Sequence, residues 1–181
     1  MKKRFFFLAL SCAFAASLFA QKLPSADAVL KEARAQAAKE NKKVMVIFHA
    51  SWCGWCRKMD TSLNDPSVKS FFDRNYVITH LTIDESPDKK NLENPGAKAL
   101  NEKWGGKDRG IPFWVIMDAD GKILVDSQRE PGKNVGCPAT AEEVAHFINV
   151  LKKTSSITDA QITAVENRFR KNERAGSAAS F

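Results

Sequence analysis

Short apolar runs alternate with amphipathic stretches along most of this chain. Residues 44–50 are apolar and rich in β-branched and aromatic side chains, which predicts a buried central strand, and residues 76–83 alternate enough for a second. The Ala/Lys/Glu-rich stretch 25–39, with Ser25 or Asp27 as a cap, predicts an amphipathic helix before the first strand. Further helices are predicted over residues 56–63, 66–72 and 97–104.

The second half of the chain predicts a hairpin followed by helices. Apolar runs at 113–117 and 122–126 flank Asp118-Ala119-Asp120-Gly121, a strong hairpin signal, whereas residues 84–94 are polar and loop-like. Thr140 with Glu143, and Thr158 with Gln161, make capping boxes before two more helices. A β-α-β half joined to a β-β-α half predicts an α/β fold with a central mixed β-sheet flanked by helices, plus an appended C-terminal helix.

The first twenty residues have the layout of a secretory signal peptide. Lys2, Lys3 and Arg4 precede an uncharged stretch that ends near Ala20, and it is shorter than a membrane span. We therefore expect a signal peptide at 1–20, a main domain at 21–153, and a C-terminal helix and tail at 154–181. Lipidation at Cys12, the one route by which we would expect a membrane contact, stays open as an alternative.

Composition narrows the function classes. The 181 residues are 44% hydrophobic, which suits one domain with a core. Cleavage near Ala20 would remove three positive charges and reduce the net charge from +7 to +4, with the remaining charges interspersed, so we expect no nucleic-acid partner. Only three of the four cysteines would remain, too few for a disulfide-stapled scaffold.

Cys53 and Cys56 are the strongest chemical signal. Cysteines three apart at a helix start are close enough for a disulfide, and the helix N-terminus favours the thiolate of the first. Cys53 would then attack and Cys56 would resolve the mixed disulfide. Two alternatives remain: a static disulfide, and half of a zinc site, although no second paired ligand spacing accompanies the two cysteines.

The stretch around the pair, Val46 to Cys56, resembles the active-site strand and loop of the thioredoxin superfamily. Leu81-Thr82-Ile83-Asp84 and Gly110-Ile111-Pro112 resemble two further motifs of that family, in the same order, so the likeness spans about 43–152. The chain is similar to exported bacterial thioredoxin-like proteins with Trp-Cys-Gly-x-Cys centres. The resemblance implies a thioredoxin-like fold and thiol-disulfide exchange. We expect no cofactor, because electrons move through sulfur alone in such an exchange, and no metal, because the second pair of ligands is missing.

The same resemblance implies a substrate groove. Ile111-Pro112 would be cis and opposite Cys53, with the Ile111 backbone free to pair with an extended partner segment, although an ordinary trans proline is compatible with the sequence. The residues expected to bind the partner are Trp52, Gly54, Trp55, Ile111, Pro112 and Gly136. Partners would be protein disulfides or dithiols and a redox protein that resets the pair.

Departures from the family pattern raise two questions. Ile47 stands where thioredoxin has a buried acid that moves the proton of the second cysteine, so His49 or His80 is a candidate for this role, beside the alternative of two structural histidines. Cys137 follows Gly136 in the stretch similar to the family's glycine loop, where it is either a third redox thiol or a buried inert one.

We accordingly expect a periplasmic or secreted monomer that acts as a thiol-disulfide oxidoreductase. The sequence leaves open whether it reduces, oxidises or isomerises disulfides, because Trp55 replaces the proline of thioredoxin between the cysteines and such residues influence the reduction potential. A reductase dedicated to one client, such as an apocytochrome, is a narrower alternative. The alternative from another class is a thioredoxin-like binding or chaperone-type module with structural cysteines.

Overall fold

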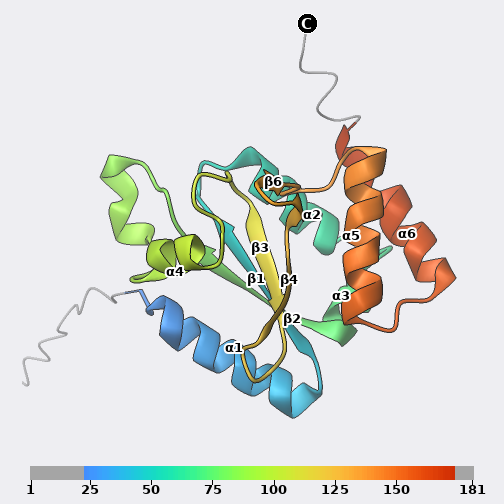
Figure 1. The fold of residues 1–181 in the computed structure, drawn as a ribbon, viewed down its shortest axis with the longest axis horizontal. Coiled ribbons are helices and arrows are strands. Elements are labelled where there is room, and N and C mark those ends of the chain that lie inside the picture. The colour runs from blue at the N-terminus through green and yellow to red at the C-terminus, as the bar shows by residue number, and fades with distance from the viewer. Residues whose placement is uncertain (1–22, 174–181) are drawn as a thin grey trace, which may run out of the picture.

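The computed structural model describes residues 23–173 of the chain (Figure 1). The expected signal peptide, Cys12 and the small polar stretch 175–180 lie outside the described residues. The elements, in chain order, are α1 (Ala26–Glu40), β1 (Lys43–His49), α2 (Gly54–Leu63), α3 (Lys69–Asn75), β2 (Tyr76–Thr82), the 3-10 helix η1 (Pro87–Leu92), α4 (Ala97–Lys103), β3 (Phe113–Met117), β4 (Ile123–Asp126), β5 (Gln128–Glu130), β6 (Lys133–Asn134), α5 (Ala141–Thr154) and α6 (Asp159–Phe169).

Four strands form a mixed sheet in the order β2-β1-β3-β4. β1 runs parallel to β2 and antiparallel to β3, and β4 returns antiparallel to β3 through the predicted hairpin. In that turn the Asp118 carboxylate accepts from the backbone N–H groups of Asp120 and Lys122, and Gly121 adopts a positive φ of 89°. The α/β fold with a mixed sheet and flanking helices is therefore confirmed.

Helices cover both faces of the sheet because the side chains of β1 alternate between two buried layers. Val44, Val46 and Phe48 pack with α1 and α4 on one side, and Met45 and Ile47 pack with α2, α3, α5 and α6 on the other (Figure 1). The second layer contains most of the aromatic core. Phe72, Phe147 and Phe169 form a cluster there, with ring centroids of the last two 4.9 Å apart.

The C-terminal helix contributes to this main core. Val165 and Phe169 of α6 are fully buried, in the same cluster as the side chains of α5. Both predicted capping boxes are present, at Thr140 and Thr158, and Ser25 is the cap of α1. The division of the chain at residue 153 stays a prediction.

Three local predictions were wrong or incomplete. Pro66 does not open a helix: Asp65 accepts from the backbone N–H and hydroxyl of Ser67 in a turn, and α3 begins only at Lys69. The active-site helix starts at Gly54 rather than Cys56, because Cys53 itself caps it. The polar loop after β2 contains η1, and the small β5–β6 hairpin had no signal in the sequence.

Candidate active site

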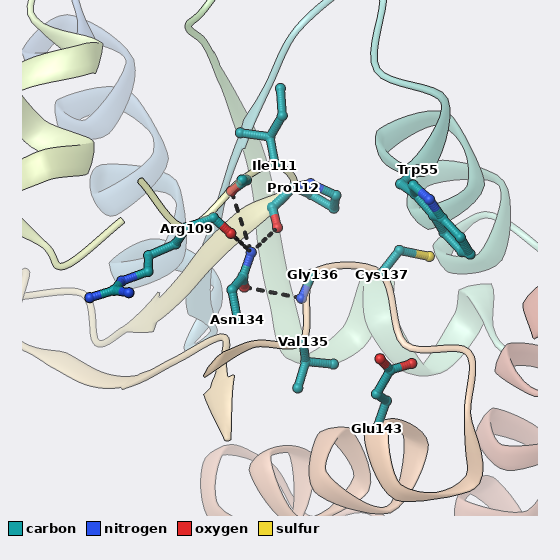
Figure 2. A pocket seen from close by; sticks show the side chains of 10 residues that line it. Trp55, Arg109, Ile111, Pro112, Asn134, Val135, Gly136, Cys137 and Glu143 are labelled. Carbon is teal, nitrogen blue, oxygen red and sulfur yellow. Dashed lines mark hydrogen bonds between the residues drawn. The ribbon is translucent and has the colours of Figure 1, made fainter. Parts of the chain in front are cut away.

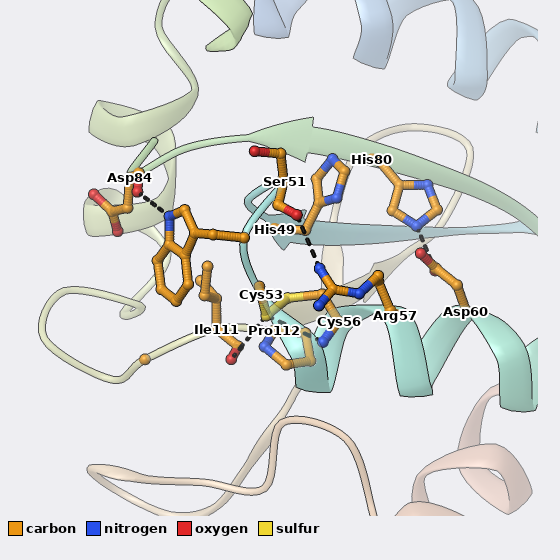
Figure 3. Close-up of a disulfide and its surroundings, with 12 residues drawn as sticks. His49, Ser51, Cys53, Cys56, Arg57, Asp60, His80, Asp84, Ile111 and Pro112 are labelled. Carbon is orange, nitrogen blue, oxygen red and sulfur yellow. Dashed lines mark hydrogen bonds and ion pairs between the residues drawn. A yellow bond between two sulfur atoms is a disulfide. The ribbon is translucent and has the colours of Figure 1, made fainter. Parts of the chain in front are cut away.

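A disulfide joins Cys53 and Cys56 where the central strand meets α2 (Figure 3). The Cα atoms are 5.3 Å apart and the sulfur atoms 2.07 Å apart. Cys53 is the N-cap of α2, and its Sγ accepts from the backbone N–H of Cys56 at 3.0 Å. The backbone N–H of Cys56 in the first turn therefore points toward the sulfur of Cys53, and the positive end of the helix dipole adds to its effect.

The pair is enclosed, although it lies between a strand and a helix. Cys53 is 3% exposed and Cys56 is 2% exposed, because Ala50 and Ile111 pack against them. The tryptophans that flank Cys53 are instead open to solvent, with 56% of Trp52 and 45% of Trp55 exposed. Two exposed aromatic side chains therefore stand beside the enclosed sulfur atoms.

The peptide bond between Ile111 and Pro112 is cis, as the family resemblance implied. The carbonyl oxygen of Ile111 lies 3.6 Å from Cys53 Sγ, so the two segments face each other across the disulfide (Figure 3).

A groove of about 240 Å³ opens beside this proline (Figure 2). Its lining includes Trp55, Ile111, Pro112 and Gly136, four of the six residues expected to bind a partner. Gly54 lines a different cavity, and Trp52 lies against the loop after β2, where its indole N–H donates to the carbonyl of Asp84 at 2.8 Å. The role of all six residues in binding remains a prediction.

One side chain that the sequence did not single out holds the walls of the groove together. The Asn134 amide group donates to the carbonyl groups of Arg109, Gly110 and Pro112, at 3.0, 3.3 and 3.1 Å, and its oxygen accepts from Gly136 N–H at 3.0 Å (Figure 2). Gly136 has a φ of +60°, and a Cβ there would meet the Pro112 carbonyl oxygen at 3.2 Å. This position therefore favours glycine for both its conformation and its close contact.

A buried carboxylate fixes the loop that precedes the cysteines. Glu85 is 3% exposed and accepts from the backbone N–H of Ser51 at 2.5 Å and from its hydroxyl at 2.7 Å. Burial alone would raise the pKa of Glu85, but the two hydrogen bonds from Ser51 outweigh it and hold the pKa below its ordinary value. Glu85 lies in the segment that the sequence predicted as a polar loop, so no pattern marked it.

The two histidines lie side by side near the disulfide, with ring centroids 5.0 Å apart (Figure 3). His80 Nε2 is 2.8 Å from Asp60 Oδ1 on α2, and His49 Nε2 is 3.1 Å from the Thr82 hydroxyl. Burial is the main cause that lowers the pKa of His49, and the neighbouring His80 lowers it further. His49 is therefore neutral near pH 7, with a lone pair available.

Cys137 lines the groove, but its sulfur is enclosed. The residue is buried, and the Asn172 amide nitrogen lies 3.5 Å from Sγ. Burial raises the pKa of the Cys137 thiol to about 12, so almost none of it is thiolate at neutral pH. These properties favour the inert alternative over a third redox thiol.

Within residues 23–173, no group of three or more His, Cys, Asp or Glu side chains is arranged to hold a metal ion. No helix in that part of the chain is both long and apolar enough to cross a membrane.

A disulfide at the start of the helix that follows the central strand, opposite a cis proline, defines the class of thioredoxin-fold proteins. Family comparison agrees: the family described as thioredoxin-like matches residues 26–119, and this chain belongs to it. The match includes both cysteines and Pro112.

Among curated proteins, the chain is similar to disulfide bond reductase DsbH of Chlamydia pneumoniae, with 33% identity over 104 residues. That alignment covers 56% of this chain and 61% of the relative. Among solved structures, it is similar to a disulphide isomerase from Xylella fastidiosa, with 19% identity, a TM-score of 0.47, and coverage of 79% of this chain and 87% of the other. The C-terminal domain of Neisseria meningitidis DsbD in its oxidised form has 26% identity and a TM-score of 0.39, with coverage of 57% and 84%.

Proposed function

We propose that this protein is an exported thiol-disulfide oxidoreductase that exchanges disulfides with partner proteins through Cys53 and Cys56. The observation that carries the proposal is the position of Cys53 Sγ, at the N-terminus of α2 and 3.6 Å from the Ile111 carbonyl beside a groove. The relative from Chlamydia pneumoniae, which is named a disulfide bond reductase, supports the same chemistry. The charged and then apolar layout of residues 1–20 supports export to the periplasm.

The exchange needs only the two sulfur atoms and a proton acceptor. In the reducing direction the Cys53 thiolate attacks a partner disulfide, whose S–S bond breaks as the mixed disulfide forms, and the released partner thiolate takes a proton. Cys56 then loses its proton and attacks Cys53 Sγ, which releases the second partner thiol. Two electrons pass to the partner, and the protein is left with the disulfide of this structure.

Cys53 acts as the nucleophile because of its helix position. In the disulfide form the backbone nitrogen of Cys56 already lies 3.0 Å from Cys53 Sγ. The same N–H donor would stabilise a Cys53 thiolate at that place. Cys56 lies inside the first turn and is packed within the protein, which suits the resolving role.

The pair formed by Asp60 and His80, with His49 beside it, is the proposed route for the proton of Cys56. Asp60 lies one helical turn after Cys56 on α2, and its carboxylate reaches His80 across to β2. This route would replace the buried acid that thioredoxin has at the position of Ile47. Replacement of both histidines by Gln should shift the pH dependence of Cys56 reactivity, and an unchanged pH profile would exclude the histidines as the route.

The groove supports recognition of an extended partner segment. Asn134 links the carbonyl of Pro112, which follows Ile111, to the N–H of Gly136 on the other wall, and Trp55 also lines the groove. We propose that a segment next to the reacting cysteine of the partner lies here, paired with the Ile111 backbone as an added strand.

The function is tested by exchange with a disulfide-bonded protein substrate, together with the reduction potential of the pair in a glutathione buffer. Wild-type protein should exchange, Cys53→Ser should not, and Cys56→Ser should accumulate a mixed disulfide through Cys53. A potential near −270 mV would make the protein a reductant and one near −120 mV an oxidant. Full biological activity of Cys53→Ser would instead establish the binding or chaperone-type module.

A further inference from the structure

A second and larger cavity, of about 510 Å³, lies between the active-site helix and the C-terminal end of the described chain. It is lined by Gly54, Arg57, Lys58, Thr61, Asp65, Arg168, Lys171 and Asn172. Gly54 directly follows Cys53, so the cavity reaches the first turn of the helix that carries the disulfide. It is separate from the groove beside Pro112, because the two linings share no residue.

The floor of this cavity is well fixed. The Asn172 side chain is buried, and its amide donates to the Ser62 hydroxyl on α2 and to the Pro138 carbonyl, both at 3.0 Å. Arg168 lies 2.8 Å from Asp65 through its Nε atom and donates through Nη1 to the Asn172 oxygen at 3.3 Å. The segment after α6 is thereby held against α2.

The charge of the lining is strongly unbalanced. Four cationic side chains surround the cavity with one carboxylate, and that carboxylate, Asp65, is paired with Arg168. Among residues 23–173, no ion pair involves Arg57, Lys58 or Lys171. The first turn of α2 carries no acidic residue, and its dipole adds to the positive potential.

The cavity and the groove meet at adjacent residues. Trp55 lines the groove and Gly54 lines the cavity, and the Lys58 ammonium group, which also lines the cavity, lies 4.1 Å from the centre of the Trp55 ring. A polypeptide that occupies the groove while its cysteine reacts at Cys53 would therefore lie next to the cavity.

We propose that the cavity is a docking site for an acidic segment of the partner polypeptide, close in sequence to the cysteine that reacts with Cys53. The proposal rests on the thiol-exchange function proposed above and adds the charge of the partner. Asp and Glu side chains complement the three cations that have no carboxylate partner among the described residues, and complementary charge raises the association rate at low salt.

The test uses peptides whose single cysteine is capped as a disulfide with 2-mercaptoethanol, and whose flanking residues are acidic, neutral or basic. Reduced protein is mixed with each peptide, and the second-order rate of Cys53–Cys56 disulfide formation is measured at low and high salt. The acidic peptide should react about fivefold faster than the neutral one at low salt, the effect of one charge pair near a surface, and this advantage should fall with salt.

Lys171→Glu supplies the matched variant, because Lys171 is exposed and outside the exchange machinery. Its control is Lys31→Glu, an equal charge change on α1, which covers the opposite face of the sheet. Lys171→Glu should lose most of the preference for the acidic peptide while it keeps the wild-type rate with the neutral peptide. Lys31→Glu should keep both.

Thermal unfolding of the two variants shows whether each is folded, and Lys171→Gln replaces Lys171→Glu if the latter is not. Equal rates for the three peptides, or equal losses in both variants, would overturn the docking proposal and leave the exchange function intact. A slower rate of Lys171→Glu with the neutral peptide as well would also overturn it, since the effect would then not be electrostatic recognition. Absence of any reaction in the wild type would refute the exchange function itself.

Discussion

Glu85→Gln should destabilise the protein through the loop that precedes the cysteine pair. The buried carboxylate accepts two hydrogen bonds from Ser51, and bonds to a charged group contribute about 1.5–3 kcal/mol each, offset in part by the cost of burying the charge. Gln has the same shape but no charge, so we expect a loss of about 2 kcal/mol. For a chain of this size that lowers the melting temperature by about 4–8 °C.

The pH dependence of stability distinguishes the effect of the Glu85 charge from the effect of its shape. The pKa of Glu85 is lowered in the folded protein, so its carboxylate stabilises the fold above the unfolded pKa of about 4.3. This contribution is lost as the pH falls through the lower folded pKa. The stability difference between wild type and Glu85→Gln should therefore be largest near pH 7 and shrink below about pH 4.

Urea unfolding of the oxidised protein at several pH values between 3 and 7 measures this difference. Glu166→Gln, an exposed acid on α6, is the control and should change the stability by less than about 0.5 kcal/mol. A Glu85→Gln difference that stayed constant from pH 7 to pH 3, or one no larger than the control, would refute the assignment of Glu85 as the group that holds Ser51.

Further predictions concern the core, the third cysteine and the histidines. Phe169→Ala should lower the free energy of unfolding in urea by about 3–5 kcal/mol, because the fully buried Phe169 ring packs on the aromatic cluster. The control Leu92→Ala, at a residue that is 39% exposed, should lower it much less. Equal losses would place α6 outside the cooperative core. Cys137 should resist alkylation by iodoacetamide at pH 8 in the folded, oxidised protein and react only after denaturation, and rapid labelling would contradict its raised pKa. Burial lowers the pKa values of His49 and His146, so protonation favours the unfolded chain and the stability of the protein should fall as the pH drops below about 6.5. A variant with both His49→Gln and His146→Gln should lose less stability than the wild type between about pH 7.5 and 5.5. An equal loss would exclude these two histidines as the cause.

The predictable part of this protein is the part that local sequence determines. The apolar run of β1, the hairpin turn at Asp118 and the capping box at Thr140 each depend on neighbours within a few residues, and all three are in the structure. The location of the cysteine pair followed in the same way, because a strand and a helix flank it directly.

The missed features depend on contacts between distant segments. Glu85 reaches Ser51 across 34 positions, and Asp60 meets His80 only because β2 pairs with β1 in one register. Asn134 belongs to a two-residue strand that no periodicity could show. Side chains of this kind are ordinary polar residues in the sequence, and only tertiary packing gives them a partner.

The hydrogen bonds of Asn134 hold the walls of the groove through backbone groups. A single amide links the Pro112 segment to the Gly136 segment through their backbone groups, and Arg109 and Val135 also line the groove. Under the proposed function, substitutions at Arg109 or Val135 should change which peptides bind in the groove, because the Asn134 hydrogen bonds that link its walls reach only backbone groups there. The proposed function thus predicts two positions at which the choice of partner can be altered, and both lie outside the cysteine pair.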